Sequence, residues 1–452
     1  MDHLQNVLSY FDQQQPLCAE HDRIPKDLYR EFGVKAGLRD ETGKGVLAGL
    51  TNISDIRAFQ YVDGVKHPAD GQLLYRGYDV KDLINGSRSS RFAFEEAGYL
   101  LLFGQLPTPE QLEQFCAVLG ECRTMPTNFT RDVIMKAPSH DIMNSMARSV
   151  LTLASYDPKA ADLDTSNVLR QSIQLAGIFP MLAVYSYHAY NHYEKDASMY
   201  IHRPDPSLST AENFLRMLRP DMQYTPLEAR VLDVALLLHA EHGGGNNSTF
   251  TCRVLTSSGT DAYSAYAAAI GALKGPRHGG ANIKVMQMLD SFKENVKNWE
   301  DEGQVADHMR KILRKEAGDG SGLIYGMGHA VYTLSDPREV ILKRKAMELA
   351  HGKDIEAEFR LLDTIERLTP EIFRDFKTSD KAICANVDMY SGLVYKMLGI
   401  PADLYTPMFA ISRIAGWAAH RMEETITGKR IIRPAYKAIA KERAYVPLDD
   451  RD

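Results

Sequence analysis

The chain contains 452 residues, of which 44% are hydrophobic and 25% are charged, and its net charge is −6. This length predicts two or three domains, and the mixture of acids and bases argues against a nucleic-acid-binding protein. The five cysteines are scattered without a Cys-x-x-Cys spacing, which favours a reducing compartment over a disulfide framework. No apolar run approaches the roughly 20 residues of a membrane span, and no leader pattern is evident. We therefore expect a cytoplasmic globular protein without a membrane segment.

The first part of the sequence has the only β pattern. Residues 1–45 are polar and weakly patterned, so we expect an arm rather than a domain. Strand-like pieces follow at residues 46–53 and 58–62. Asp63-Gly64 comes directly after the second piece and is typical of a two-residue hairpin turn. A further short strand-like run at residues 72–77 completes a small predicted β element.

Helical periodicity dominates from Asp79, a plausible helix N-cap. Residues 94–103 predict a helix that stops at Gly104, and residues 168–190 are apolar on nearly every side, as expected for a buried helix. Thr225-Pro226-Leu227-Glu228 is a capping box with proline at the first helical position. These patterns predict a mainly α protein.

The density of charge changes along the chain and suggests how it divides. The stretch 283–387 is rich in charged residues and carries shorter helices, whereas apolar helices return after it. We therefore predict an arm at 1–45, a large helical domain formed by 46–282 and 388–452, and an inserted smaller domain at 283–387.

One histidine stands between helix breakers in the segment 275–282, Gly-Pro-Arg-His-Gly-Gly-Ala-Asn. The apolar helix predicted at 262–274 ends at Gly-Pro, and a second helix is expected from Ala281. His278 therefore lies at a helix junction, where the two following glycines leave room for a ligand beside the backbone. The alternative is a histidine hydrogen-bonded within a tight loop.

Two other glycine-rich loops contain histidines. Residues 239–248 hold His239 and His242, and residues 326–332 hold His329. Histidines on ligand-accessible backbone fit a site, but a helix C-terminus also favours a cation, which is the better reading for His239. His329 has the alternative of a loop histidine bonded to a carbonyl. The His-x-x-His spacing lacks a convincing third ligand, so we expect no metal.

The remaining candidate site residues are one aspartate and three arginines. Asp388 stands just before an apolar helix, where it is either a functional carboxylate or simply an N-cap. Arg338, Arg413 and Arg433 can each recognise a carboxylate through a bidentate fork. Arg413 lies inside an apolar helix and needs a buried partner, whereas the other two arginines taken singly are typical of solvated surface.

Taken together, these segments resemble the citrate synthase family, and the match covers most of the chain. Its motifs occur in the family's order at residues 75–79, 95–107, 239–248, 275–282, 326–338, 386–392 and 407–434. The resemblance implies a mainly helical, two-domain homodimer whose small domain closes over substrate. It also implies condensation of acetyl-CoA with oxaloacetate, without a metal or a redox cofactor and without a nucleic-acid or membrane partner.

The resemblance also implies roles by motif position. Asp388 would remove a methyl proton from acetyl-CoA, His278 would stabilise the resulting enol, and His329 would polarise and protonate the oxaloacetate carbonyl. The family's carboxylate-binding positions are matched by His242, Arg338, Arg413 and Arg433, the last donated by the other subunit, and positions lining the site by Asn246 and Ser248. A thioester methyl is a very weak acid and aspartate a weak base, so acid and base must act together.

The sequence departs from the family's pattern at positions that contact CoA in other members. Many members carry a basic residue directly after the histidine matched by His329, or four residues after it, whereas Ala330 and Thr333 stand there. One CoA phosphate contact is therefore in doubt. Lys381 matches a basic CoA-contacting position in some members.

Three alternatives follow from the same residues. A 2-methylcitrate synthase would use propionyl-CoA, and one methylene is worth only about 1–3 kcal/mol in a pocket. A non-catalytic helical binding protein of the same fold is disfavoured because Asp388, His278 and His329 are all present. A hydrolase is weaker still, because no Gly-x-Ser-x-Gly motif is found.

Overall fold

The computed structural model describes residues 2–40, 44–87, 90–329, 331–376 and 383–451. The chain separates into two compact units, Met1–Leu50 and Thr51–Asp452. The first unit holds α1 (Asp2–His21), α2 (Lys26–Glu31) and the short 3-10 turn η1 (Ala36–Leu38). The predicted arm falls inside this unit. The division of the remaining chain into a large domain and an inserted small domain stays a prediction.

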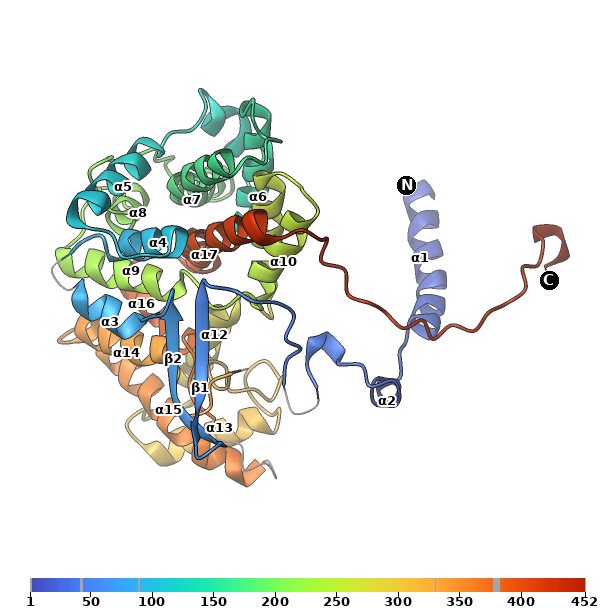
Figure 1. Cartoon of the computed structure of the whole chain (residues 1–452). Coiled ribbons are helices and arrows are strands. Elements are labelled where there is room, and N and C mark those ends of the chain that lie inside the picture. The colour runs from blue at the N-terminus through green and yellow to red at the C-terminus, as the bar shows by residue number, and fades with distance from the viewer. Residues whose placement is uncertain (1, 41–43, 88–89, 330, 377–382, 452) are drawn as a thin grey trace. The chain divides into compact units, whose positions relative to one another are not determined.

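Helices make up most of the second unit, so the mainly α prediction is confirmed (Figure 1). The described helices are α3 (Val80–Gly86), α4 (Ala93–Phe103), α5 (Pro109–Glu121), α6 (Ile142–Leu153), α7 (Thr165–Glu194), α8 (Thr210–Leu218), α9 (Pro226–His239), α10 (Asn247–Ser257), α11 (Ala262–Leu273), α12 (Ala281–Asn295), α13 (Glu302–Leu313), α14 (Pro337–Ala350), α15 (Glu356–Phe376), α16 (Asp388–Met397) and α17 (Tyr405–Thr427). Short helical turns occur at η2 (Thr130–Ile134), η3 (Ala154–Tyr156), η4 (Ala402–Leu404) and η5 (Leu448–Asp450).

Local capping chemistry explains where several helices begin and end. Thr225 accepts a hydrogen bond from the Glu228 amide, and the Glu228 carboxylate accepts one from the Thr225 amide, which is the predicted capping box of α9. Asp79 accepts from the Lys81 amide at 2.9 Å and caps α3. Gly104 ends α4 with a left-handed φ of 78°. These predictions are confirmed. They could be made from the sequence because each depends on residues within one turn of the helix end.

The β element is an antiparallel sheet of β1 (Ser54–Val62), β2 (Val65–Tyr75) and β3 (Tyr78–Asp79), in that order. Asp63 and Gly64 have φ values of 52° and 78°, so the predicted hairpin turn is confirmed. The strand predicted at 46–53 is wrong. Leu47 and Leu50 are each 88% exposed, and no described strand pairs with this piece, so neither burial nor hydrogen bonding favours extension there.

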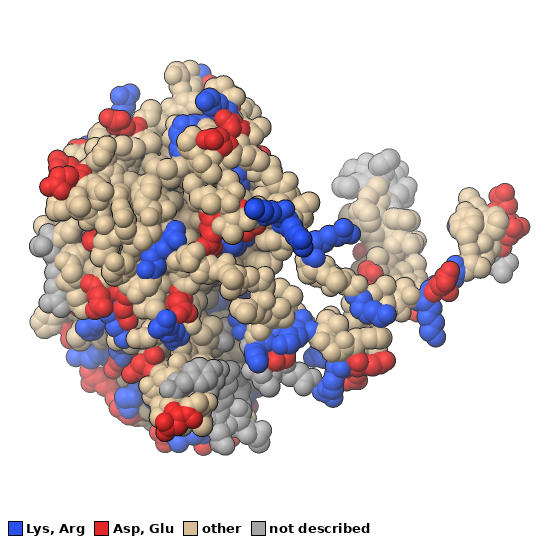
Figure 2. Space-filling view, viewed as in Figure 1, with Lys and Arg blue, Asp and Glu red and all other residues tan. Residues whose placement is uncertain are grey.

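Helix α17 lies at the centre of the second unit, in contact with α4, α7, α9 and α10 (Figure 1). Its side chains are buried without interruption from Tyr405 to Arg421. The 30-residue α7 is likewise buried around its middle, as its apolar sequence predicted. On the face seen in Figure 2, acidic and basic side chains are interspersed over the second unit. The core therefore places α17 against the loops that follow α9 and α11, where Gly416 N donates to Ala240 O and Thr406 Oγ1 donates to Gly279 O.

Candidate active site

The loop after α9 positions the first group of site residues. His239 ends the helix, and its Nδ1 lies 2.8 Å from the carbonyl oxygen of Ala235, so it acts locally at the helix end. The expectation of a cation there is wrong, because burial lowers the pKa of His239 to about 3 and the ring is neutral at pH 7. The chain then turns at Gly243, whose φ is 90°, and holds the imidazole of His242 in a buried position. The fully buried Glu241 carboxylate accepts from Ser54 Oγ at 2.9 Å, which ties this loop to β1.

His278 lies between α11 and α12, at the predicted helix junction. Its Nε2 lies 3.1 Å from Ser248 Oγ and accepts from the Ser248 amide at 3.4 Å. Burial and the nearby Arg413 lower the pKa of His278 to about 4, so the ring is neutral at pH 7. Because a backbone amide can only donate, the single ring proton lies on Nδ1. The structure thus presents His278 as a neutral donor.

The glycine after His278 has a packing role. A Cβ at Gly279 would lie 2.5 Å from the carbonyl oxygen of Leu273 and 2.9 Å from Thr406, so no side chain fits between α11 and α17. The expectation of open backbone at this position is therefore wrong. Glycine is required because α12 begins directly against the end of α11.

The loops that carry His329 and Asp388 are joined by backbone hydrogen bonds. Gly328 N donates to Cys384 O, and Asn386 N donates to Gly326 O, both at 2.8 Å. The side-chain amide of Asn386 donates a further hydrogen bond of 2.9 Å to Gly328 O. Residues more than fifty positions apart in the sequence are thereby held as one short two-stranded bridge.

Two backbone amides that follow His329 in the chain orient its ring. Its Nδ1 accepts from the amides of Val331 at 3.0 Å and Tyr332 at 3.1 Å. The lone pair at Nδ1 is therefore occupied, and a neutral ring carries its proton on Nε2. The Tyr332 ring stacks on the imidazole with centroids 4.6 Å apart, and the His242 ring meets it edge-on at 5.2 Å.

Asp388 is the first residue of α16, but its side chain does not cap the helix. Asn386 Oδ1 instead accepts from the Asp388 amide at 3.0 Å. Within the described residues, Oδ1 of Asp388 is enclosed by protein and has no hydrogen-bond partner. Burial raises the pKa of Asp388 to about 6, with partial opposition from Arg338 and Arg413. The N-cap alternative is therefore wrong, and the carboxylate is available for other chemistry.

Two of the predicted arginines are buried beside this carboxylate. Asp336 holds Arg338 through a bidentate pair, with Nε–Oδ1 at 3.0 Å and Nη2–Oδ2 at 2.6 Å. Arg413 donates from Nε to the carbonyl oxygen of His239 at 2.6 Å, and its buried Nη1 has no partner among the described residues. Burial lowers the pKa of Arg413 to about 10, so it stays charged at pH 7. A buried guanidinium with an open donor is typical of an anion site.

The predicted residues fall into two adjoining groups. Electrostatic interactions join the first group, namely His242, His329, Arg338, Arg413 and Asp388. Hydrogen bonds join the second, in which Ser248 Oγ lies 3.0 Å from Asn246 Oδ1 and 3.1 Å from His278. Arg413 links the groups, since its charge also acts on His278.

One predicted residue, Arg433, is not brought into this cluster. Arg433 is exposed on the segment that follows α17, and Lys381 and Ala330 lie outside the described residues. Sequence reasoning in turn missed Asn386 and Tyr332, which orient Asp388 and His329. The only sequence signal for Asn386 was an asparagine two residues before a helix start.

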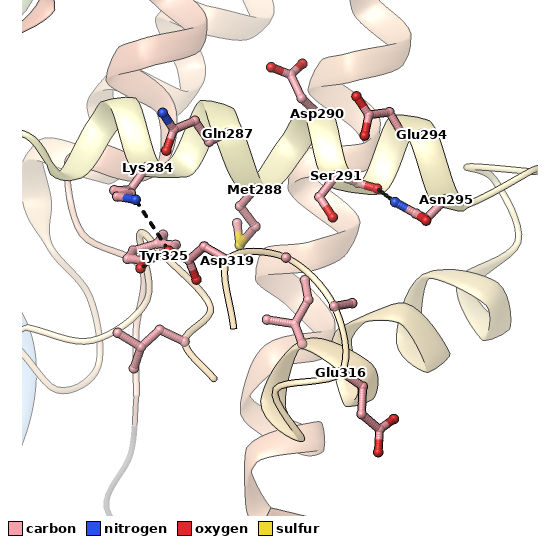
Figure 3. A pocket seen from close by; sticks show the side chains of 14 residues that line it. Lys284, Gln287, Met288, Asp290, Ser291, Glu294, Asn295, Glu316, Asp319 and Tyr325 are labelled. Atoms are coloured by element: carbon pink, nitrogen blue, oxygen red, sulfur yellow. Dashed lines mark hydrogen bonds and ion pairs between the residues drawn. The ribbon is translucent and has the colours of Figure 1, made fainter. Parts of the chain in front are cut away.

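Two pockets of about 490 Å³ differ in whether predicted site residues line them. One opens beside His278 and is lined by Asn246, Asn247, Ala272, Gly275, Pro276, Arg277 and His278. The other lies between α12 and residues 316–325, where Figure 3 shows Asp290, Glu294, Glu316 and Asp319 around it. Lys284 pairs there with Asp319 at 3.4 Å. The second pocket contains none of the predicted site residues.

Among the residues that the structure describes, no group of three or more His, Cys, Asp or Glu side chains is arranged to hold a metal ion. No helix in the same residues combines the length and apolarity needed to cross a bilayer.

Comparison with known proteins places this geometry in a family. The family model "Citrate synthase, C-terminal domain" matches residues 38–435. Citrate synthase of Corynebacterium glutamicum is 35% identical over 86% of this chain and 85% of its own length. A 2-methylcitrate synthase of Shewanella oneidensis is 33% identical over 84% of this chain and 92% of its own.

Solved structures agree with these matches. The ternary complex of Thermoplasma acidophilum citrate synthase with carboxymethyl coenzyme A and oxaloacetate is 27% identical, covers 92% of this chain and 98% of its own, and superposes with a TM-score of 0.73. A family match across most of the chain thus accompanies the cluster of His278, His329 and Asp388. The chain belongs to the citrate synthase family.

Proposed function

We propose that this enzyme condenses acetyl-CoA with oxaloacetate to citryl-CoA and then hydrolyses the thioester to citrate and CoA. The observation that carries the proposal is the Asp388 carboxylate, whose Oδ1 is enclosed without a hydrogen-bond partner among the described residues and which interacts electrostatically with Arg338 and Arg413. A raised pKa of about 6 makes Asp388 a stronger base than an ordinary aspartate, yet leaves it mostly ionised at pH 7.

The three residues divide the carbon–carbon bond formation between them. Asp388 takes a proton from the methyl group of acetyl-CoA, and Nδ1–H of His278 stabilises the charge that develops on the thioester oxygen. The enol carbon then attacks the carbonyl carbon of oxaloacetate. His329 donates its Nε2 proton to the carbonyl oxygen, which becomes the hydroxyl of citryl-CoA. Water finally attacks the thioester, and CoA leaves as the thiol. The proton that Asp388 accepted returns through water to His329, which restores both residues.

The buried cations give the site its preference for a dicarboxylate. Arg338 is held rigidly by Asp336, while Arg413 keeps Nη1 open, so the two guanidinium groups present fixed donors to substrate carboxylates. Burial keeps the pKa of His242 well below its ordinary value, so this ring contributes a neutral hydrogen bond. Asn246 and Ser248 line the same side, next to His278.

We further propose a homodimer in which Arg433 of one copy completes the site of the other. Arg433 is exposed in the single chain and follows the last long helix, which leaves it available to a second copy. Lys381 remains a proposed CoA contact. The family needs only its substrates and no cofactor.

We place the reaction at the entry of the tricarboxylic acid cycle, in the cytoplasm. Five free cysteines fit a reducing compartment.

The test is steady-state release of free thiol with acetyl-CoA or propionyl-CoA, each with oxaloacetate, in the presence of a chelator. We expect oxaloacetate-dependent release with kcat/KM highest for acetyl-CoA, and loss of release in His278→Ala. A preference for propionyl-CoA would favour a 2-methylcitrate synthase, the activity named for the Shewanella relative. Absence of release with either thioester would overturn the proposal.

A further inference from the structure

One face of α17 holds both ends of the loop that carries His242, Asn246 and Ser248. At the first end, Gly416 N donates to Ala240 O at 3.1 Å, and His420 Nε2 lies 3.0 Å from Glu241 Oε1. At the other end, Trp417 Nε1 donates to Ser248 Oγ at 3.2 Å. Helical spacing of three and four places these residues on the same side as Arg413.

Trp417 is fully buried, and its indole N–H is a donor only. The hydrogen bond to Ser248 therefore occupies a lone pair of Oγ on the side of α17. The hydroxyl hydrogen must then point away from the helix. It has two acceptors within reach there, His278 Nε2 at 3.1 Å and Asn246 Oδ1 at 3.0 Å.

This arrangement defines which nitrogen of His278 faces the substrate. The Ser248 amide already donates to Nε2 at 3.4 Å. The hydroxyl has one hydrogen, with Asn246 Oδ1 and His278 Nε2 both in reach, and it adds a second donor to Nε2 whenever it turns to the histidine. Two donors at Nε2 disfavour a proton there and keep it on Nδ1. A donor polarised by its own hydrogen bond from the indole makes this preference stronger.

We propose that Trp417 is a positioning residue for the reaction, which acts through Ser248 to hold His278 as the Nδ1–H tautomer. The inference rests on the proposed role of His278 as the donor to the thioester oxygen. Without the indole N–H, the Ser248 hydroxyl is free to rotate toward α17. Only the long contact of 3.4 Å from the Ser248 amide then opposes a proton on Nε2. His278 therefore spends part of its time with a lone pair facing the developing oxyanion, where it opposes the reaction.

The first experiment compares the two tryptophans of the chain. Trp417→Phe removes the indole N–H, and we expect kcat to fall about five- to tenfold, as for loss of one hydrogen bond, while KM for oxaloacetate stays within about twofold. Trp299→Phe makes the same change where Nε1 donates to Val296 O at 3.0 Å. This control should keep wild-type kcat. Equal kcat values for Trp417→Phe and wild type would overturn the proposal.

The second experiment separates positioning from packing. Ser248→Ala removes the group through which Trp417 acts, so Trp417→Phe should lower kcat no further in that background. Independent, multiplicative losses in the double variant would show a packing effect and overturn the proposal. A fall in melting temperature shared by both backgrounds does not alter this comparison, because the ratio of kcat values within each background is what is read.

The third experiment needs no change at Trp417, and so remains decisive where Trp417→Phe does not fold. In protein labelled with 15N-tryptophan, the Trp299→Phe variant assigns the two indole N–H resonances. Ser248→Ala should then shift the Trp417 resonance and leave the Trp299 resonance in place. An unmoved Trp417 resonance would overturn the hydrogen bond. Wild-type thiol release and its loss in His278→Ala test the proposed function separately.

Discussion

Two charged residues of this site each have a buried polar atom that lacks a hydrogen-bond partner among the described residues. These atoms are Asp388 Oδ1 and Arg413 Nη1. Such groups cost stability unless something else satisfies them, so they mark positions kept for a ligand. In the proposed reaction, a substrate carboxylate satisfies the arginine and a methyl proton satisfies the aspartate.

Replacing Asp388 by Asn tests the base directly. Since Asp388 does not cap α16, we expect the variant to keep its melting temperature and its affinity for oxaloacetate. Its kcat should fall by about 10²–10⁴, as for loss of a general base. Asp403→Asn changes a half-exposed aspartate paired with Lys195 at 3.8 Å and should leave kcat unchanged. A near-normal kcat in Asp388→Asn would refute the assignment.

The pH dependence follows from the same carboxyl group. Only ionised Asp388 can accept the methyl proton, so kcat/KM should fall as pH decreases through about 6, the raised pKa of Asp388. The pKa of His278, about 4, lies below this range and does not produce the limb. Initial rates between pH 5 and 9 measure the profile. An acid limb centred below pH 5 would contradict a raised pKa in the free enzyme.

Close contacts between secondary-structure elements hold the site residues in place, and even a methyl group added at such a contact would disturb them. Strand β2 passes against the loop that leads from His329 to Arg338, where Gly71 N donates to Ser335 Oγ at 3.2 Å. Ser335 Oγ in turn donates to Asp70 Oδ1 at 2.9 Å. The hairpin thus supports the segment that carries His329 and Arg338, although it lies more than 200 residues earlier in the sequence.

Gly71→Ala should disturb that support. A Cβ at Gly71 would lie 2.2 Å from Ser335 O and 2.6 Å from Tyr332, so either β2 or the loop must move. We expect a loss of about 1–3 kcal/mol in the free energy of unfolding and a raised KM for oxaloacetate. Gly86→Ala, where nothing lies within 4 Å of the added Cβ, is the matched control. Unchanged stability and KM in Gly71→Ala would show that the hairpin is not in firm contact with the loop.

At the scale of the whole molecule, the single chain does not bring every predicted residue to the site. Arg433 is exposed after α17, whereas Arg338 and Arg413 are buried beside Asp388. Exposed apolar side chains follow Arg433, including Tyr436 at 94% and Tyr445 at 81%. Surface of this kind on an extended segment is typical of contact with another chain.

Subunit mixing tests the shared site. Arg433→Ala and His278→Ala chains are each expected to be inactive as homodimers. A heterodimer has one site with both residues intact, so mixing the two variants should restore up to about half the activity per such dimer. Mixing two differently tagged His278→Ala chains is the control and should restore none. A verified heterodimer without activity would show that Arg433 does not act in the other subunit.

The features that the sequence determined by itself are local ones, namely turns and the ends of helices. The capping box of α9, the Asp63-Gly64 turn, the stop at Gly104 and the junction around His278 depend on a few neighbouring residues, and each prediction is confirmed. The family motifs added the identity of the site residues, because a motif preserves residue type and order across most of the chain.

Tertiary structure alone decided what those residues meet. Whether Asp388 caps a helix or stands free depends on Asn386 taking the amide and on Arg338 and Arg413 arriving from other elements. The tautomer of His278 depends on Ser248 and, through it, on Trp417 from α17, 139 positions further along than His278 in the chain. Burial and proton position are properties of the packed environment, so no local pattern encodes them.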